Sequence, residues 1–170
     1  MKIKARDLLL LLGIAGAVIA LDQWTKWLVE QKIPLGEEVY PIGFLAPFFR
    51  FTFWKNTGAA FGLFQSASMV LLIVSCLIAL LLIWIYFKSL EEPVLFRISL
   101  SMMLGGAIGN IIDRLTQGFV TDFIAVGRFP VFNVADSAVT VGVGLMFLGL
   151  YLQEKKQKSE PEKAEEIDEN

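Results

Sequence analysis

Long apolar stretches separated by short polar segments dominate this chain of 170 residues. The stretch 69–87 contains no charged residue, glycine or proline, and it is long enough to cross a hydrocarbon core of about 30 Å as a helix. Three other stretches show helical apolar patterns. The sequence therefore predicts four transmembrane helices, at about residues 8–30, 68–87, 95–114 and 132–152.

A cleaved signal peptide is the alternative for the first of these stretches. An apolar run there follows three cations, and residues 15–17 (Ala-Gly-Ala) offer a cleavage site. The helical pattern continues past this point through Trp24 and Trp27 to Val29, which gives a helix of about seven turns. We therefore expect a retained transmembrane helix.

The cations at the helix ends predict which way the bundle faces. Four spans place both termini on one side, together with Lys88 of the short second loop and the lysines within 155–158. Cytoplasmic loops of membrane proteins are enriched in Lys and Arg. We therefore expect cytoplasmic termini, with Arg97 snorkelling toward that side, and two outer segments at about 33–67 and 115–131.

The first outer segment carries a strand signal. Residues 49–55 (Phe-Arg-Phe-Thr-Phe-Trp-Lys) alternate with period two, and the glycine-spaced stretch 56–62 favours a turn. The alternative is that these aromatic residues form a belt at the membrane interface. We favour a small sheet that lies on the outer membrane surface.

Composition limits the chemistry that this chain can perform. The protein is 55% hydrophobic, with a mean hydropathy of +0.61, which is typical of a membrane protein. It has no histidine and one cysteine, Cys76, which excludes His-dependent triads, Cys–His pairs, His-ligated zinc and an intrachain disulfide. Residues 153–170 are highly charged and lack aromatic residues, so we expect a disordered cytoplasmic tail after a single membrane domain, 1–152.

Three aspartates are the only acidic residues between Glu92 and Glu154, namely Asp113, Asp122 and Asp136. An ionised carboxylate at a bilayer's centre costs roughly 2.5–3.5 kcal/mol, so such residues are usually functional and paired. With no histidine in the chain, buried aspartates point towards aspartic chemistry.

Two of these aspartates belong to polar stripes on the predicted third and fourth helices. The stripes are Asn110, Asp113 and Arg114 on one helix and Asn133, Asp136, Ser137 and Thr140 on the other. Residues spaced i, i+3 and i+4 share one helical face. A Gly105-xxx-Gly109 motif and a similar pair at 138 and 142 would let these helices pack closely, which would bring the stripes together at the outer end.

The three aspartates differ in their sequence neighbours. Asp113 has Arg114 beside it, and we expect a structural ion pair. Asp122 and Asp136 have no adjacent cation; if they face each other, they would share one proton. Such a pair offers a base to activate water and an acid to protonate a leaving amine, although periodicity alone does not select Asp122 over Asp113.

Asp22 and Lys26 add a third polar pair, on the outer half of the first helix. Their i, i+4 spacing permits an ion pair within the helix. A role in orienting a substrate or a lipid headgroup is the alternative.

Five motifs occur in an order that resembles a known family. They are Asp22-Gln-Trp-Thr-Lys26, Asn56-Thr57-Gly58-Ala59-Ala60-Phe61, Gly105-Gly106-Ala107-Ile108-Gly109-Asn110-Ile111-Ile112-Asp113-Arg114, Val120-Thr121-Asp122-Phe123-Ile124 and Phe132-Asn133-Val134-Ala135-Asp136-Ser137. This constellation, from about residue 20 to 145, resembles the prolipoprotein signal peptidases (signal peptidase II). These are bacterial intramembrane aspartic proteases.

The resemblance implies both a fold and a set of site residues. It implies an all-α membrane protein of four helices in the bacterial cytoplasmic (inner) membrane, with a small outer β-cradle. It implies that Asp122 and Asp136 are the catalytic dyad and that Asp113 belongs to the structural pair with Arg114. The implied support residues are Asp22, Lys26, Asn56, Gly58, Asn110, Arg114, Asn133 and Ala135.

The resemblance also implies the reaction. The substrate would be a prolipoprotein whose cysteine carries diacylglycerol, cut on the amino side of that cysteine by a monomeric enzyme embedded in membrane lipid. Water would be the nucleophile, so no metal or organic cofactor is expected, and no nucleic acid.

A small proton-coupled transporter or a membrane assembly subunit is the alternative function. A transporter should carry polar residues through the full depth of the membrane. Here the cytoplasmic halves of the helices are almost entirely apolar apart from Ser and Thr, and polarity is concentrated at the outer ends. This distribution favours a site on one side of the membrane.

Overall fold

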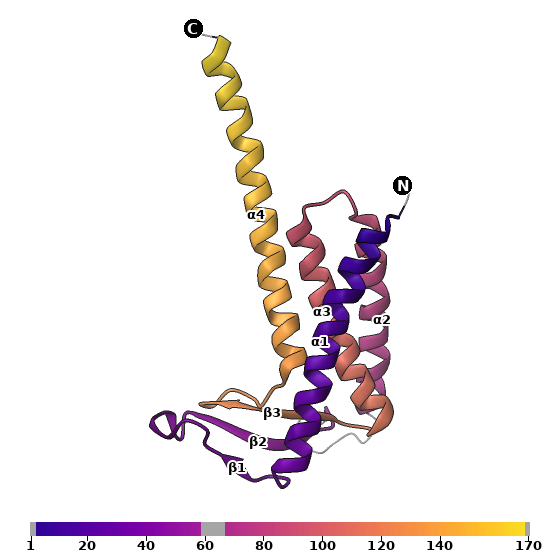
Figure 1. The fold of residues 1–170 in the computed structure, drawn as a ribbon, viewed down its shortest axis with the longest axis vertical. Coiled ribbons are helices and arrows are strands. Elements are labelled where there is room, and N and C mark those ends of the chain that lie inside the picture. The colour runs from indigo at the N-terminus through magenta and orange to yellow at the C-terminus, as the bar shows by residue number, and fades with distance from the viewer. Residues whose placement is uncertain (1–2, 59–66, 169–170) are drawn as a thin grey trace.

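Long helices and a small sheet form the part of the chain that the computed structural model describes, residues 3–58 and 67–168. The helices are α1 (Ala5–Lys32), α2 (Ala67–Lys88), α3 (Val94–Thr116) and α4 (Val134–Asp168), and the strands are β1 (Glu38–Val39), β2 (Phe49–Asn56) and β3 (Val120–Val126). A short 3-10 helix, η1 (Gly43–Leu45), lies between β1 and β2. The helices stand side by side with the sheet across one end, and the N-terminus and the free end of α4 lie at the other (Figure 1).

The helices match the transmembrane segments that the sequence predicts. Each is long and apolar enough to cross a membrane, α4 through Lys156. An apolar helix surface without charges is stable in hydrocarbon because the helix satisfies its own backbone hydrogen bonds. The predicted fold class, a membrane protein of four helices with a small sheet, is confirmed.

Helix α3 lies at the centre and packs against α1, α2 and α4. Its glycines permit this close approach: a Cβ at Gly105 would lie 2.8 Å from the carbonyl oxygen of Ala15 in α1, and one at Gly106 would clash with the carbonyl oxygen of Ala135 in α4. Gly142 packs on the α3 backbone in the same way. The predicted close packing of α3 and α4 is present, but Gly105 faces α1, and its neighbour Gly106 is the glycine that faces α4.

The predicted sheet is also present. It is antiparallel with the strand order β1-β2-β3. Phe51 and Phe53 of β2 and Phe123 of β3 pack against Val29 and Ile33 at the end of α1. These aromatic residues bind the sheet to the helices, so the β2 segment is more than an interfacial belt.

The predicted turn at 56–62 is described only through Gly58, whose φ is +75°, and its remainder lies outside the described residues. Strand β3 was not expected from the sequence. It pairs along β2 and places Asp122 opposite Trp54.

The tail beyond residue 152 differs from its prediction. The structure continues it as part of α4 through Asp168, where the sequence predicts disorder. Glu, Lys, Gln and Ala are good helix formers, which allows the hydrogen-bond ladder to continue beyond the apolar span. This part of the helix stands away from the bundle (Figure 1).

Arg97 does not snorkel as the sequence predicts. It is buried, and its Nη1 donates to Asp7 Oδ1 at 2.8 Å. The Tyr86 hydroxyl donates to the Asp7 carbonyl oxygen at 2.6 Å. A buried cation is tolerated when a carboxylate neutralises it, so this polar cluster joins α1, α2 and α3 at the end away from the sheet.

Candidate active site

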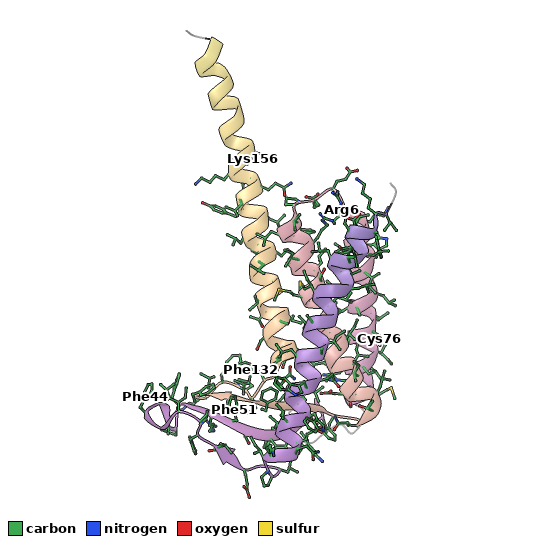
Figure 2. The ribbon with its side chains drawn as sticks, in the orientation of Figure 1. Arg6, Phe44, Phe51, Cys76, Phe132 and Lys156 are labelled. Carbon is green, nitrogen blue, oxygen red and sulfur yellow. The ribbon has the colours of Figure 1, made fainter. Side chains whose placement is uncertain are left out.

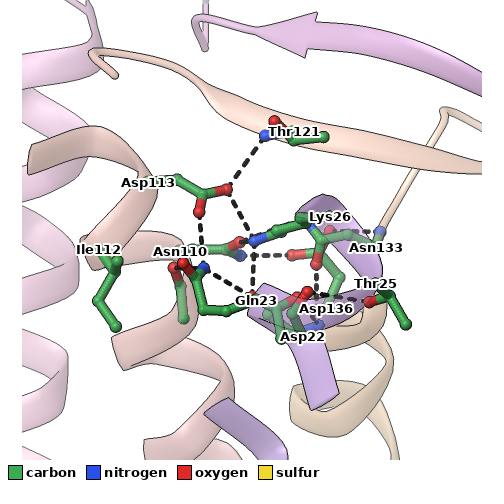
Figure 3. Close-up of polar contacts among 12 residues, drawn as sticks. Asp22, Gln23, Thr25, Lys26, Asn110, Ile112, Asp113, Thr121, Asn133 and Asp136 are labelled. Carbon is green, nitrogen blue, oxygen red and sulfur yellow. Dashed lines mark hydrogen bonds and ion pairs between the residues drawn. The ribbon is translucent and has the colours of Figure 1, made fainter. Parts of the chain in front are cut away.

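The three aspartates singled out in the sequence come from three elements that meet where the sheet joins the helices. Asp113 lies near the end of α3, Asp122 lies on β3 and Asp136 lies in the first turn of α4. Figure 3 shows the polar side chains of α1 reaching into the same region. The packing of α3 against α1 and α4 is what brings these groups together.

Asp122 is buried and held by two amides. Asn56 Nδ2 donates to its Oδ2 at 2.8 Å, and Asn133 Nδ2 donates to its Oδ1 at 2.7 Å. Burial, which disfavours the charged form, raises the pKa of Asp122 to about 6, against the opposing effect of these amide bonds. The nearby charge of Asp136 raises this pKa further, and the charge of Lys26 lowers it.

Asp136 is fixed by a reciprocal cap at the start of α4. The Asn133 Oδ1 accepts from the Asp136 N–H at 2.9 Å, and Asp136 Oδ2 accepts from the Asn133 N–H at 3.2 Å. This is the capping-box arrangement. Asn110 Nδ2 donates to the other carboxylate oxygen at 2.8 Å. Asn133 therefore contacts both Asp122 and Asp136 and links their positions.

Both carboxyl groups line one cavity of about 520 Å³. Its walls also include apolar side chains from the segment after β3 and from α4, namely Phe129, Pro130, Val131, Phe132 and Val141. A neighbouring cavity of about 510 Å³ extends along Trp54 and Gly58 and shares Asp122. Two carboxyls that face a common space, Asp122 buried and Asp136 partly exposed, can serve as the base and the acid of a hydrolysis.

Asp113 pairs with Lys26 and not with Arg114, so the predicted structural ion pair is wrong. Lys26 Nζ lies 2.8 Å from Asp113 Oδ2 and 2.8 Å from Asp22 Oδ2, with the lysine only 2% exposed. Side chains of adjacent residues on a helix do not face each other, so Arg114 does not pair with Asp113. Its Nη1 donates to the Asn110 carbonyl oxygen at 3.3 Å.

The other predicted support residues belong to the same network. Asn110 Oδ1 accepts from Lys26 Nζ at 2.9 Å and thereby connects the Lys26 cluster to Asp136. The Ala135 N–H donates to Asp22 Oδ1 at 2.9 Å. The Gly58 N–H donates to Asn56 Oδ1 at 2.8 Å, and this bond orients the amide that reaches Asp122.

Sequence reasoning missed three residues that contact this network. Gln23 Nε2 donates to Asp113 Oδ1 at 2.7 Å, and the Thr121 N–H donates to Asp113 Oδ2 at 3.1 Å. Thr121 Oγ1 donates to Glu30 Oε1 at 2.6 Å. One signal was available: Gln23, Lys26 and Glu30 are spaced i, i+3 and i+7, so they share one face of α1.

Replacing Lys26 with Met is expected to destabilise the protein strongly. The change leaves Asp22 and Asp113 buried without their shared cation, and breaking a buried ion pair costs about 3–5 kcal/mol. The free energy of unfolding in detergent micelles measures the effect. Lys32→Met, at an exposed position at the end of the same helix, is the matched control, and equal stability of the two variants would contradict the buried pairing.

Comparison with known proteins places most of this chain in one group. A family model described as Signal peptidase (SPase) II matches residues 14–152. The lipoprotein signal peptidase of Halalkalibacterium halodurans is 40% identical over 151 residues, which cover 86% of this chain and 95% of the relative. That of Shouchella clausii is 42% identical over 146 residues, which cover 85% and 95%.

Solved structures agree with this grouping. A bacterial membrane enzyme structure determined at 2.3 Å aligns with a TM-score of 0.76 and 32% identity, covering 88% of this chain and 92% of the other. A second such structure, at 1.9 Å, aligns with a TM-score of 0.75 and 32% identity, covering 82% and 91%. The fold of this chain is therefore shared with solved bacterial membrane enzymes over most of its length.

Proposed function

This chain belongs to the signal peptidase II family, and we propose that Asp122 and Asp136 are the catalytic dyad with which it works. It is an aspartic endopeptidase that removes signal peptides from prolipoproteins. The observation that carries the proposal is the shared position of the two carboxyls on one cavity, linked through Asn133. A transporter is not supported by the family match.

The dyad divides the proton transfers of the reaction between two carboxyls. The ionised carboxylate accepts a proton as the water oxygen adds to the scissile carbonyl carbon, and the protonated carboxyl donates to the carbonyl oxygen. When the C–N bond breaks, the leaving nitrogen takes the proton that the first carboxylate received from water, and a hydroxyl of the diol intermediate returns a proton to the second carboxylate, which regenerates the dyad. A carboxyl such as Asp122, with a pKa of about 6, can accept and return a proton near neutral pH.

The surrounding residues have positioning roles in this proposal. Asn56, Asn110 and Asn133 orient the carboxyls through their amide groups. The Lys26 cluster, with Asp22 and Asp113, holds α1, α3 and α4 in register beneath the sheet. Arg114, Gly58 and Ala135 support this arrangement through backbone contacts: Arg114 on the Asn110 carbonyl oxygen, Gly58 on the Asn56 side chain, and Ala135 on the Asp22 carboxylate.

The proposed substrate is a diacylglyceryl-modified prolipoprotein, cut on the amino side of its lipidated cysteine. Phe129, Val131, Phe132 and Val141 beside the dyad offer an apolar wall for acyl chains. Such a wall allows the lipid to stay in an apolar medium while the peptide bond reaches the carboxyls.

The proposed orientation places both termini in the cytoplasm of a bacterium and the dyad at the outer face of its cytoplasmic membrane. Arg6 and Lys156 lie at the end of the molecule away from Phe51 and Phe132 (Figure 2). Cations mark the cytoplasmic end of membrane helices. We propose further that the enzyme works as a monomer.

The direct test is incubation of the purified protein in detergent micelles with a diacylated prolipoprotein precursor. We expect two products, the free signal peptide and a lipoprotein that begins at the lipidated cysteine. A gel separates the products, and mass spectrometry identifies the new amino terminus. A cut at any other bond would contradict the proposed specificity.

The pH dependence of cleavage is expected to report on Asp122. An inflection of kcat/KM is expected at pH about 6, where this carboxyl titrates. Asn56→Ala removes an amide that donates to the ionised form, so the pKa of Asp122 should rise and the inflection should move to higher pH. An unmoved inflection in this variant would show that Asp122 is not the group that titrates.

A further inference from the structure

Thr121 is held from two directions immediately before Asp122. It is fully buried, its N–H donates to Asp113 Oδ2 at 3.1 Å, and its Oγ1 donates to Glu30 Oε1 at 2.6 Å. The first bond ties β3 to α3 and the second ties it to α1. The strand is therefore fixed to two helices one residue before the carboxyl that faces the cavity.

The alternation of a strand makes this contact relevant to Asp122. Successive side chains on a strand point to opposite faces of the sheet. With Thr121 directed at α1, Asp122 is directed at the opposite face, where it lines the cavity. A shift of β3 by one residue would exchange these two side chains, and the hydrogen bond to Glu30 opposes such a shift.

Glu30 also holds the short connection that leads into β3. The same oxygen, Oε1, accepts from Gln117 Nε2 at 3.3 Å, at the end of α3. Glu30 thus contacts both ends of the segment between α3 and β3. Two hydrogen bonds from opposite ends of a short loop restrict its conformations more than either bond would alone.

We propose that Glu30 and Thr121 form a positioning pair that holds Asp122 in place for catalysis. The pair lies on the face of the sheet opposite to the cavity. The inference rests on the proposed role of Asp122. Neither residue needs to contact the substrate: Glu30 acts on Thr121, and Thr121 acts through the backbone that it shares with Asp122. The pair keeps the carboxyl within reach of the Asn56 and Asn133 amides.

Thr121→Val tests the pair with little change in shape. Valine keeps the β-branch that suits a strand but cannot donate to Glu30. We expect kcat to fall about tenfold or more, since a misplacement of ~1 Å at a catalytic group can cost ~10²-fold, with KM nearly unchanged. Thr121→Ser, which keeps the hydroxyl, should restore most of the activity.

Glu30 variants test the other side of the same bond. Glu30→Leu removes the acceptor and should resemble Thr121→Val, whereas Glu30→Gln keeps an acceptor oxygen and should stay near wild type. The double variant Glu30→Leu, Thr121→Val should be no slower than the slower single variant, because the two changes remove one shared interaction. Losses that multiply in the double variant would overturn the pairing.

Two further readouts separate positioning from a loss of folded protein. Activity is referred to the concentration of folded enzyme. The matched control is Thr116→Val, where an exposed hydroxyl donates to carbonyl oxygens of its own helix, α3. The inflection of kcat/KM near pH 6 should move upward in Thr121→Val, because displaced amides stabilise the Asp122 carboxylate less. Wild-type kcat and an unmoved inflection in Thr121→Val would overturn the inference.

Asp122→Asn, assayed in parallel, distinguishes failure of the inference from failure of the proposed dyad. An inactive Asp122→Asn beside a fully active Thr121→Val would overturn the positioning pair alone. Cleavage by Asp122→Asn would overturn the dyad, and the positioning pair with it.

Discussion

Asp122→Asn and Asp136→Asn are each expected to abolish cleavage while the protein stays folded. Asn keeps the shape of Asp but cannot titrate, and removal of general acid–base catalysis costs roughly 10²–10⁴-fold or more. The carboxylates accept hydrogen bonds from amides, Asn133 to Asp122 and Asn110 to Asp136. An Asn can keep one such bond through its own oxygen, so the loss of stability should be small.

Single-turnover cleavage of the diacylated precursor at equal folded concentrations measures this effect. Asp7→Asn is the matched control, because Asp7 is also buried and paired but lies at the end away from the sheet. Its turnover should stay near wild type once the amount of folded protein is matched. Turnover by either dyad variant well above that of the double variant would contradict the assignment of the dyad.

The helices were predictable because each one depends on its own sequence. A long apolar stretch such as 69–87 has to span the membrane as a helix whatever surrounds it. Strand β2 was predictable for a related reason, since its sequence alternates with period two, and Phe51 and Phe53 of this pattern pack against the end of α1. These elements carry their signals in contiguous residues.

Strand β3 and the partner of Asp113 were not predictable in this way. Val120–Val126 is buried along most of its length, and a strand buried on both faces lacks the alternation that reveals a strand. Asp113 was assigned to its sequence neighbour Arg114, but its cation comes from Lys26, on another helix. A contact between residues so far apart in sequence can be predicted only when the packing of α3 against α1 is known.

The catalytic candidates were predictable only in part. Spacing placed Asn110 and Asp136 on helical faces that could meet, and the structure joins them by a hydrogen bond. Spacing alone gave no reason to prefer Asp122 to Asp113; only the family resemblance did. The structure supplies a physical difference: Asp113 is neutralised by Lys26, whereas Asp122 is held by neutral amides and faces the cavity.

The lipid on the substrate is expected to determine its recognition. A diacylated precursor should be cleaved far faster than the same precursor with a free cysteine. Each methylene transferred from water to an apolar environment contributes about 0.8 kcal/mol, so two acyl chains hold the cysteine at the membrane boundary. The apolar residues beside the dyad, Phe129, Val131 and Val141 among them, can then receive the chains next to the carboxyls.

The anchored lipid also places the scissile bond. Once the acyl chains are fixed, the peptide bond on the amino side of the cysteine lies within a few atoms of the anchor, which lowers the entropy cost of bringing it to the dyad. Initial rates for the two precursors at matched detergent concentration measure the discrimination. Val141→Ala shortens the apolar wall and should reduce the difference between the two rates. Equal rates for lipidated and unlipidated precursors would show that the enzyme recognises the peptide alone, and the proposed substrate class would then be wrong.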